Sequence, residues 1–244
     1  MKKLFFAALL LNAAFVSPSQ TADEIIDKYI EAMGGKEKLN AIKALYMEGV
    51  SVMQNGNEVT SKTWIVQDKL MRREVNFGMG SFTMVVTDKE GWRSNPQNGG
   101  AFEPIAPDMV QNQQSELDCA GPLFDYAAKG HKAELIGKED VEGTECYKIK
   151  LTLKSGRDIS YFIDPKTWLI IRSTRKGGGM MGGRRGGGGA SPDAELKIDY
   201  SDYRKTPEGY MFAHTIAMGG MGASTNYEKI EVNKPVEEKL YKPQ

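Results

Sequence analysis

The sequence predicts a mainly β fold with α-helices: a curved antiparallel sheet of about ten or eleven short strands, covered by an N-terminal amphipathic helix and short helices. Three observations predict it. Residues 143–172 read as an antiparallel meander, further strand-like segments lie on both sides of it, and one strongly amphipathic helix precedes them all. A curved sheet of this kind has one apolar face to bury, and the helices are the available cover.

The meander is recognised by its alternation and its turns. Apolar and polar residues alternate over residues 147–153, the period-2 pattern of a half-buried strand. Ser155-Gly156 turns the chain into residues 158–163, which are rich in β-formers. Asp164-Pro165 begins a second turn, and residues 168–173 return as a third strand.

The N-terminal helix has a start signal and a stop signal. Thr21 followed by Glu24 fits a capping box, and Gly34-Gly35 is a natural end, so the helix is expected over residues 22–33. A short second helix is expected over residues 36–42. The apolar side chains at helical spacing are expected to form a lid over the sheet: Ile26, Tyr29, Ile30 and Met33.

The remaining elements follow from hydrophobic pattern and turn residues. Short helices are expected over residues 108–117, with Asp108 as a cap, and over residues 122–128. Strands are expected over residues 44–53, 58–67, 69–76, 81–87, 132–136, 194–202, 210–217 and 226–232. One more short strand is expected to begin at Trp92.

The N-terminus predicts export. Lys2-Lys3 precedes an apolar run over residues 4–16, and small residues before Gln20 offer a cleavage site. This pattern is typical of a secretory signal peptide over residues 1–19, too short to span a bilayer. Residues 20–244 are then a single soluble domain in the periplasm. Lysine plus arginine equals aspartate plus glutamate at 32 each, so no nucleic-acid partner is expected.

A glycine-rich insert interrupts the C-terminal half over residues 176–190. Glycine at this density carries a large entropic cost of ordering, so a flexible surface loop is expected. Its Met180-Met181 pair, among 13 methionines in the chain, leaves a Cu(I) site as an alternative, because thioethers suit that ion. The methionines form no tight array, and no metal or other cofactor is expected.

Catalytic patterns are missing from the sequence. Its two histidines, His131 and His214, have no acidic or nucleophilic neighbour at motif spacing, and a structural or surface role is the simpler interpretation. No nucleophile elbow, zinc-protease or phosphate-loop motif occurs. The prediction is a protein that is not an enzyme.

Two cysteines, Cys119 and Cys146, leave two alternatives open. They could pair in an oxidising compartment, where closing the loop between them would stabilise the chain by roughly 3–4 kcal/mol. They could equally remain two buried thiols.

Large apolar residues are spread over many of the expected strands. Each one could be ordinary core, but together they would line a curved sheet beneath a helical lid, which suits a hydrocarbon chain. The residues expected to line this hydrophobic cavity are Leu45, Met47, Trp64, Val66, Phe82, Met84, Val86, Tyr147, Ile149, Leu151, Tyr161 and Ile163.

Several segments resemble the LolA-like family of outer-membrane lipoprotein-sorting proteins. The resemblance is carried by VVTDKEGWRSNP at residues 85–96, by residues 135–149 and by the FIDPKTWL hairpin at residues 162–169. It implies an incomplete antiparallel β-barrel, or half-barrel, closed on one side by helices around an apolar cavity. One departure is evident: the Arg-Pro pair whose arginine fastens the lid in the classical carriers would fall near Gln67-Asp68, while Arg72 and Arg73 lie further on.

The resemblance implies a non-enzymatic carrier whose cavity shelters the acyl chains of a lipoprotein, or of another lipid, during outer-membrane lipoprotein sorting. Two alternatives stay open. The same fold could serve an envelope regulatory or scaffold protein that contacts membrane-anchored envelope proteins, or the chain could be a Met-dependent copper binder.

Overall fold

The computed structural model describes residues 20–53, 56–78, 80–176, 195–219 and 224–243. The predicted signal peptide and all of the glycine-rich insert after Lys176, including Met180 and Met181, lie outside the described residues.

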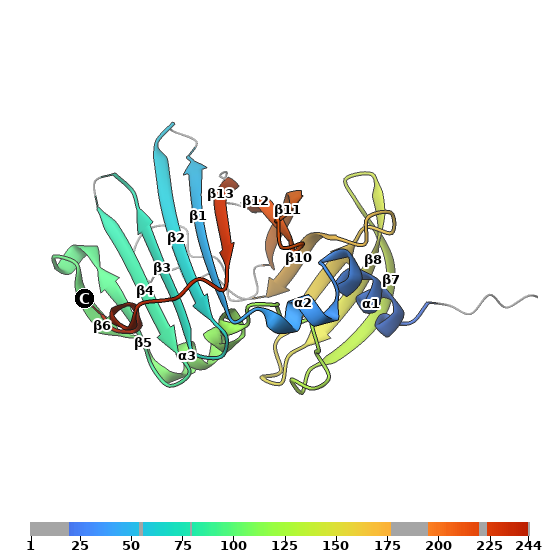
Figure 1. Ribbon diagram of the computed structural model, residues 1–244, viewed down its shortest axis with the longest axis horizontal. Coiled ribbons are helices and arrows are strands. Elements are labelled where there is room, and N and C mark those ends of the chain that lie inside the picture. The colour runs from blue at the N-terminus through green and yellow to red at the C-terminus, as the bar shows by residue number, and fades with distance from the viewer. Residues whose placement is uncertain (1–19, 54–55, 79, 177–194, 220–223, 244) are drawn as a thin grey trace, which may run out of the picture.

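One antiparallel sheet of 13 strands runs through the described residues, in the order β6-β5-β4-β3-β2-β1-β13-β12-β11-β10-β9-β8-β7. Its strands are β1 (Ala44–Val52), β2 (Glu58–Val66), β3 (Leu70–Asn76), β4 (Ser81–Thr87), β5 (Gly91–Asn95), β6 (Ala101–Pro104), β7 (Lys132–Val141), β8 (Thr144–Thr152), β9 (Asp158–Ile163), β10 (Ile170–Lys176), β11 (Glu195–Lys205), β12 (Met211–Met218) and β13 (Ser224–Val232). The end strands β6 and β7 lie at opposite sides of the molecule, so the curved sheet stays open as an incomplete barrel (Figure 1). The predicted fold class is confirmed.

Short helices cover the inner face of this sheet. They are α1 (Ala22–Ala32), α2 (Lys36–Ala41) and α3 (Pro107–Gln113), with the 3-10 turn η2 (Gln114–Leu117). The described residues also form the 3-10 turns η1 (Pro96–Asn98) and η3 (Glu238–Tyr241). Helix α1 packs against β7, while α3 and η2 pack against β4. The two ends of the sheet therefore have separate covers.

Local signals fix α1 as the sequence predicts. The Thr21 hydroxyl accepts a hydrogen bond from the Glu24 N–H at 3.2 Å, and the Glu24 carboxylate accepts one from the Thr21 N–H at 3.0 Å. The helix stops before Gly34 and Gly35, whose φ angles of 124° and 93° suit glycine. A side chain at Gly34 would also place its Cβ 2.8 Å from the Gly209 carbonyl oxygen.

Three expectations need correction. Residues 122–128 form consecutive turns and no helix. Asp108 does not cap α3: the helix begins with Pro107 at its first position, and Ala106 before it offers no capping side chain. Strand β6 is an addition that raises the count beyond ten or eleven; it is a four-residue edge strand that ends at Pro104, where a proline is tolerated.

Candidate functional site

The inner face of the sheet carries a continuous apolar surface. Residues directly opposite each other in antiparallel strands share a face. Ile65 pairs with both Leu45 and Met71 across β1, β2 and β3, and the same row continues to Val86 on β4. At the other end Ile149 pairs with Tyr161 across β8 and β9. The predicted residues on this face are Leu45, Met47, Phe82, Met84, Val86, Tyr147, Ile149, Leu151, Tyr161 and Ile163.

Trp64 and Val66 lie on the opposite, outer face, which corrects their predicted placement. Trp64 pairs with Tyr46 and Arg72, and Val66 pairs with Ala44, all of them out of phase with Leu45 and Ile65. Every residue of 64–66 on β2 is large and apolar, so composition alone does not reveal which of them point inward.

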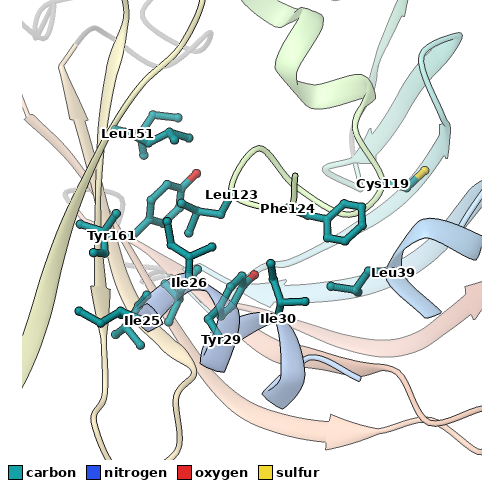
Figure 2. Packing of buried hydrophobic residues seen from close by; sticks show 14 of the residues in the cluster. Ile25, Ile26, Tyr29, Ile30, Leu39, Cys119, Leu123, Phe124, Leu151 and Tyr161 are labelled. Atoms are coloured by element: carbon teal, nitrogen blue, oxygen red, sulfur yellow. The ribbon is translucent and has the colours of Figure 1, made fainter. Parts of the chain in front are cut away.

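Helix α1 fills the space above β7–β10 with its own side chains. Ile25 and Ile26 are 0% and 2% exposed, and Tyr29 and Ile30 are 8% exposed each. Together with residues of the turn segment 118–126 they form one cluster with the sheet, which we call the inner cluster (Figure 2). The predicted lid residues Ile26, Tyr29 and Ile30 belong to it, and Met33 packs at its edge.

The inner cluster leaves no water-sized space beside its central side chains. Ile149, Leu151 and Ile163, on the sheet beneath α1, are all 0% exposed. The inner face is apolar, and the side chains of α1 occupy the space expected as a cavity. Room for a hydrocarbon chain would arise where α1 moves away.

A second cluster covers the other end of the inner face. Met71, Met84 and Val86 of the sheet pack with Val110 of α3 and Leu117 of η2. Ile65 touches both clusters and joins them. The apolar surface thus extends from β4 to β9 beneath two separate covers.

Helix α1 is attached to the rest of the fold at three points along its length. Near its start, the Tyr126 hydroxyl donates a hydrogen bond to the Asp23 carboxylate. In the middle, the Lys28 ammonium lies over the Trp168 ring. After its end, the Met211 N–H donates to the Met33 carbonyl at 3.1 Å.

Gln67 and Asp68, near the expected position of the Arg-Pro pair, fasten the segment that follows η2. The Gln67 side-chain oxygen accepts a hydrogen bond from the Cys119 N–H at 2.8 Å. The Asp68 N–H donates to the Leu117 carbonyl at 3.0 Å. Neither contact reaches α1, so the arginine latch of the classical carriers has no counterpart at these two positions.

Four tyrosines place hydroxyl groups within or beside the inner cluster. Burial raises the pKa of Tyr29, Tyr161, Tyr200 and Tyr203, so all four remain neutral hydroxyls at physiological pH. The Tyr203 hydroxyl donates to the Ile170 carbonyl at 2.7 Å, and the Tyr200 hydroxyl lies 3.0 Å from the Ser173 hydroxyl. Sequence reasoning missed Tyr200 and Tyr203, because their spacing of three residues does not follow the period-2 alternation of a strand.

Two of the depressions on the surface of the described residues have charged rims. One, of about 440 Å³, lies where β12 and β13 separate, since these strands pair only over residues 215–217 and 224–226. His214 and Ile230 line it beside three glutamates and four cationic side chains. The other, of about 430 Å³, includes Trp92 and Tyr241. Neither is a sleeve for a hydrocarbon chain.

The titratable residues of interest have structural partners. His131 Nδ1 accepts a hydrogen bond from the Lys154 N–H at 3.1 Å, and His214 Nδ1 lies 2.7 Å from the Tyr227 carbonyl oxygen. Among the described residues, no three of His, Cys, Asp and Glu come together as metal ligands.

Cys119 and Cys146 are both free and buried. Cys119 belongs to the inner cluster, whereas Cys146 packs with Val141 and Phe162 in a separate cluster. Of the two alternatives for the cysteines, the structure has the pair of buried thiols. Burial raises the pKa of Cys119 to about 12 and that of Cys146 to about 11.

Within the described part of the chain, none of the helices combines the length and apolar character needed to cross a membrane.

Comparison with solved structures finds this fold in proteins of low sequence identity. A DUF1329 family protein from Desulfovibrio piger matches with a TM-score of 0.55 and 14% identity, over 91% of this chain and 97% of that one. A LolA superfamily protein from Nitrosomonas europaea matches with a TM-score of 0.55 and 10% identity, over 92% and 99%. A putative outer membrane lipoprotein-sorting protein domain from Vibrio parahaemolyticus matches with a TM-score of 0.50 and 13% identity, over 89% and 94%.

No protein-family model and no curated protein matches the chain significantly. At these identities the structural likeness concerns the fold and not the ligand. The open curved sheet with its inner helices, together with these three likenesses, shows that the chain has a LolA-like fold.

Proposed function

We propose that the protein is a non-enzymatic periplasmic carrier that binds the acyl chains of a lipoprotein, or of another lipid, between α1 and the inner face of the sheet. The observation that carries the proposal is the apolar face beneath α1, where Ile149, Leu151 and Ile163 meet the apolar side of an eleven-residue helix. The likeness to a lipoprotein-sorting domain supports it. The predicted signal peptide supports the periplasmic location.

Displacement of α1 is the step that would make room for the ligand. An acyl chain that takes the place of the helix would keep the apolar face of the sheet covered from water. Each methylene sheltered from water contributes about 0.8 kcal/mol, which can offset the loss of the helix contacts. Gly34 and Gly35, between α1 and α2, can adopt backbone angles closed to other residues and would serve as the hinge.

Truncation of lid side chains tests this proposal, because the proposal predicts a gain in affinity for a fatty acid and not a loss. Ile26→Ala and Ile30→Ala remove side chains that occupy the proposed site, so both variants should bind a fluorescent fatty acid more tightly than the parent protein. Asp27→Ala changes an exposed residue of the same helix and should leave the affinity unchanged. Lipid extracted from protein purified out of its native envelope should contain acyl chains. If the parent and the variants bind no fatty acid and carry no lipid, the proposal is wrong.

The filled inner cluster favours a second candidate function. If α1 stays in place, the fold acts as an envelope scaffold or regulator that contacts other proteins through its surface. Crosslinking in intact cells would then recover a membrane-anchored partner from parent protein free of lipid, and Ile26→Ala would change neither lipid content nor partner.

A further inference from the structure

Two arginines lie at one edge of the inner cluster, on the apolar face of the sheet. Arg157 immediately precedes β9, and its carbonyl accepts a hydrogen bond from the Leu153 N–H across the β8–β9 turn at 2.8 Å. Arg175 of β10 lies directly opposite Ile159 of β9. Residues two apart on a strand share a face, so Arg157 and Arg175 face inward together with Ile159. Since Leu153 and Ile159 belong to the inner cluster, the apolar surface ends here at two guanidinium groups.

The cover at the other end of the inner face holds both guanidinium groups in place. Arg157 Nη1 donates a hydrogen bond to the Asn112 carbonyl of α3 at 2.7 Å. Arg175 Nη1 donates to a Glu116 carboxylate oxygen of η2 at 3.3 Å. A guanidinium carries five N–H donors in one plane, and each of these contacts engages one of them. The two groups are therefore oriented by the fold and retain donors for a further acceptor.

The charges at this edge are not balanced. Arg175 has the Glu116 carboxylate as its ion-pair partner, whereas Arg157 contacts a neutral carbonyl and has no ion-pair partner among the described residues. Burial, and then the like charge of Arg175, lower the pKa of Arg157, against the opposing effect of Glu116. One additional anion would neutralise the pair.

A ligand can reach this edge from solvent. The Arg175 and Glu116 side chains are 27% and 32% exposed, and Arg157 is half-buried. Two partly desolvated guanidinium groups favour an oxyanion, such as a carboxylate or a phosphate, which accepts several N–H bonds at once. An acyl chain that lies on Ile159 and its neighbours would bring its polar end to this position.

We propose that Arg157 and Arg175 form a headgroup site, and that the carrier takes acyl chains whose polar end is a carboxylate or a phosphate. This headgroup site depends on the proposed function, since the chain itself lies on the inner cluster where α1 moves away. Of the two cargos proposed above, it favours an anionic lipid over the chains of a lipoprotein, which end in neutral ester and amide groups.

Two ligands with the same acyl chain separate the headgroup from the hydrocarbon. A fluorescent fatty acid and the fluorescent alcohol of equal length are titrated into the parent protein at about pH 8, below the concentration at which either forms micelles. The acid should bind at least about tenfold more tightly, because its carboxylate accepts charge-assisted hydrogen bonds. Arg157→Gln and Arg175→Gln should each remove most of this preference and leave the affinity for the alcohol within about twofold. The affinity for the alcohol also reports that each variant is folded.

Arg204→Gln is the matched control, because it removes the same charge from an exposed site. The Arg204 side chain is 60% exposed and pairs with Asp202, so its loss should leave the preference for the acid unchanged. A merely structural role of Arg157 and Arg175 in fastening α3 and η2 would change the affinities for acid and alcohol by the same factor. Lysophosphatidate of the same chain length, compared with the fatty acid, shows which of the two anionic headgroups the arginines prefer.

The outcomes separate the headgroup site from the carrier function. Equal affinities of the parent protein for acid and alcohol would overturn the headgroup site and leave acyl binding in place. An unchanged preference in both Arg157→Gln and Arg175→Gln would overturn it as well. Binding of neither ligand would refute the carrier function, and the headgroup site with it.

Discussion

The Lys28 ammonium lies 4.3 Å from the centre of the Trp168 ring, and this contact joins the middle of α1 to the loop before β10. Trp168 in turn stacks on Tyr147, with ring centres 5.8 Å apart and planes within 9° of parallel. Its φ angle of 60° is unusual for a bulky residue, so the loop holds a costly backbone conformation in order to present the ring. A cation on an aromatic stack thus contributes to the attachment of the covering helix.

Lys28→Gln should therefore loosen α1. A cation–π contact at an exposed site stabilises by about 0.5–1 kcal/mol, so the free energy of unfolding should fall by about that amount. Urea unfolding followed by circular dichroism measures it. Lys36→Gln on α2 is the control, because the Lys36 side chain is 74% exposed and its nearest carboxylate is 3.9 Å away. Equal effects of the two substitutions would show that the ring contact contributes nothing.

Ile25→Ala should be far more damaging than any exposed change on α1. Ile25 is 0% exposed, and its truncation leaves a space between helix and sheet that costs about 2–4 kcal/mol. Asp27→Ala, on the solvent side of the same helix, should change the free energy of unfolding by less than about 0.5 kcal/mol. A small loss for Ile25→Ala would mean that the helix readily leaves the sheet.

The elements that local signals determine could be predicted from the sequence. The capping box at Thr21 and the glycine pair after α1 act within a few residues, and both lie where expected. Alternation over β8 correctly placed Ile149 and Leu151 on the inner face. These features depend on chain neighbours alone, which is why one sequence is enough to find them.

Features that depend on distant partners could not be predicted. Trp64 faces outward because β2 pairs with β1 and β3 in one register, and a run of large apolar residues hides that phase. Residues 122–128 contain helix formers but form turns that place Leu123 and Phe124 beneath α1. Arg72 acquires two main-chain hydrogen-bond acceptors only when a segment about 170 residues later in sequence crosses over it.

Both thiols should be unreactive in the folded protein. Burial raises the pKa of Cys119 to about 12 and of Cys146 to about 11, so the thiolate that attacks reagents is scarce at pH 8. Iodoacetamide should leave the native protein unmodified and alkylate two sites in urea, as read by mass spectrometry. A disulfide between them would appear as a denatured protein that reacts only after reduction.

His131 should make stability decrease at mildly acidic pH. Burial, then the nearby charges of Lys129 and Lys154, lower the pKa of His131 from its ordinary 6.5. The unfolded chain therefore takes up the proton first as the pH falls, so folded-state stability declines below about pH 6.5 and levels off once folded His131 is also protonated. Protonation at Nδ1 also removes the acceptor for the Lys154 N–H.

Two histidine substitutions isolate this effect. His131→Gln should reduce the decline in the free energy of unfolding between pH 7 and pH 5. Urea unfolding at each pH measures it. His214→Gln is the control and should retain the decline, because His214 Nδ1 contacts the Tyr227 carbonyl oxygen and not the Lys154 N–H. Subtracting the variant's curve from the parent's curve removes the contribution of carboxylates that titrate in the same pH range. If the parent and His131→Gln curves run parallel across this range, the proton goes elsewhere and His131 is not the cause.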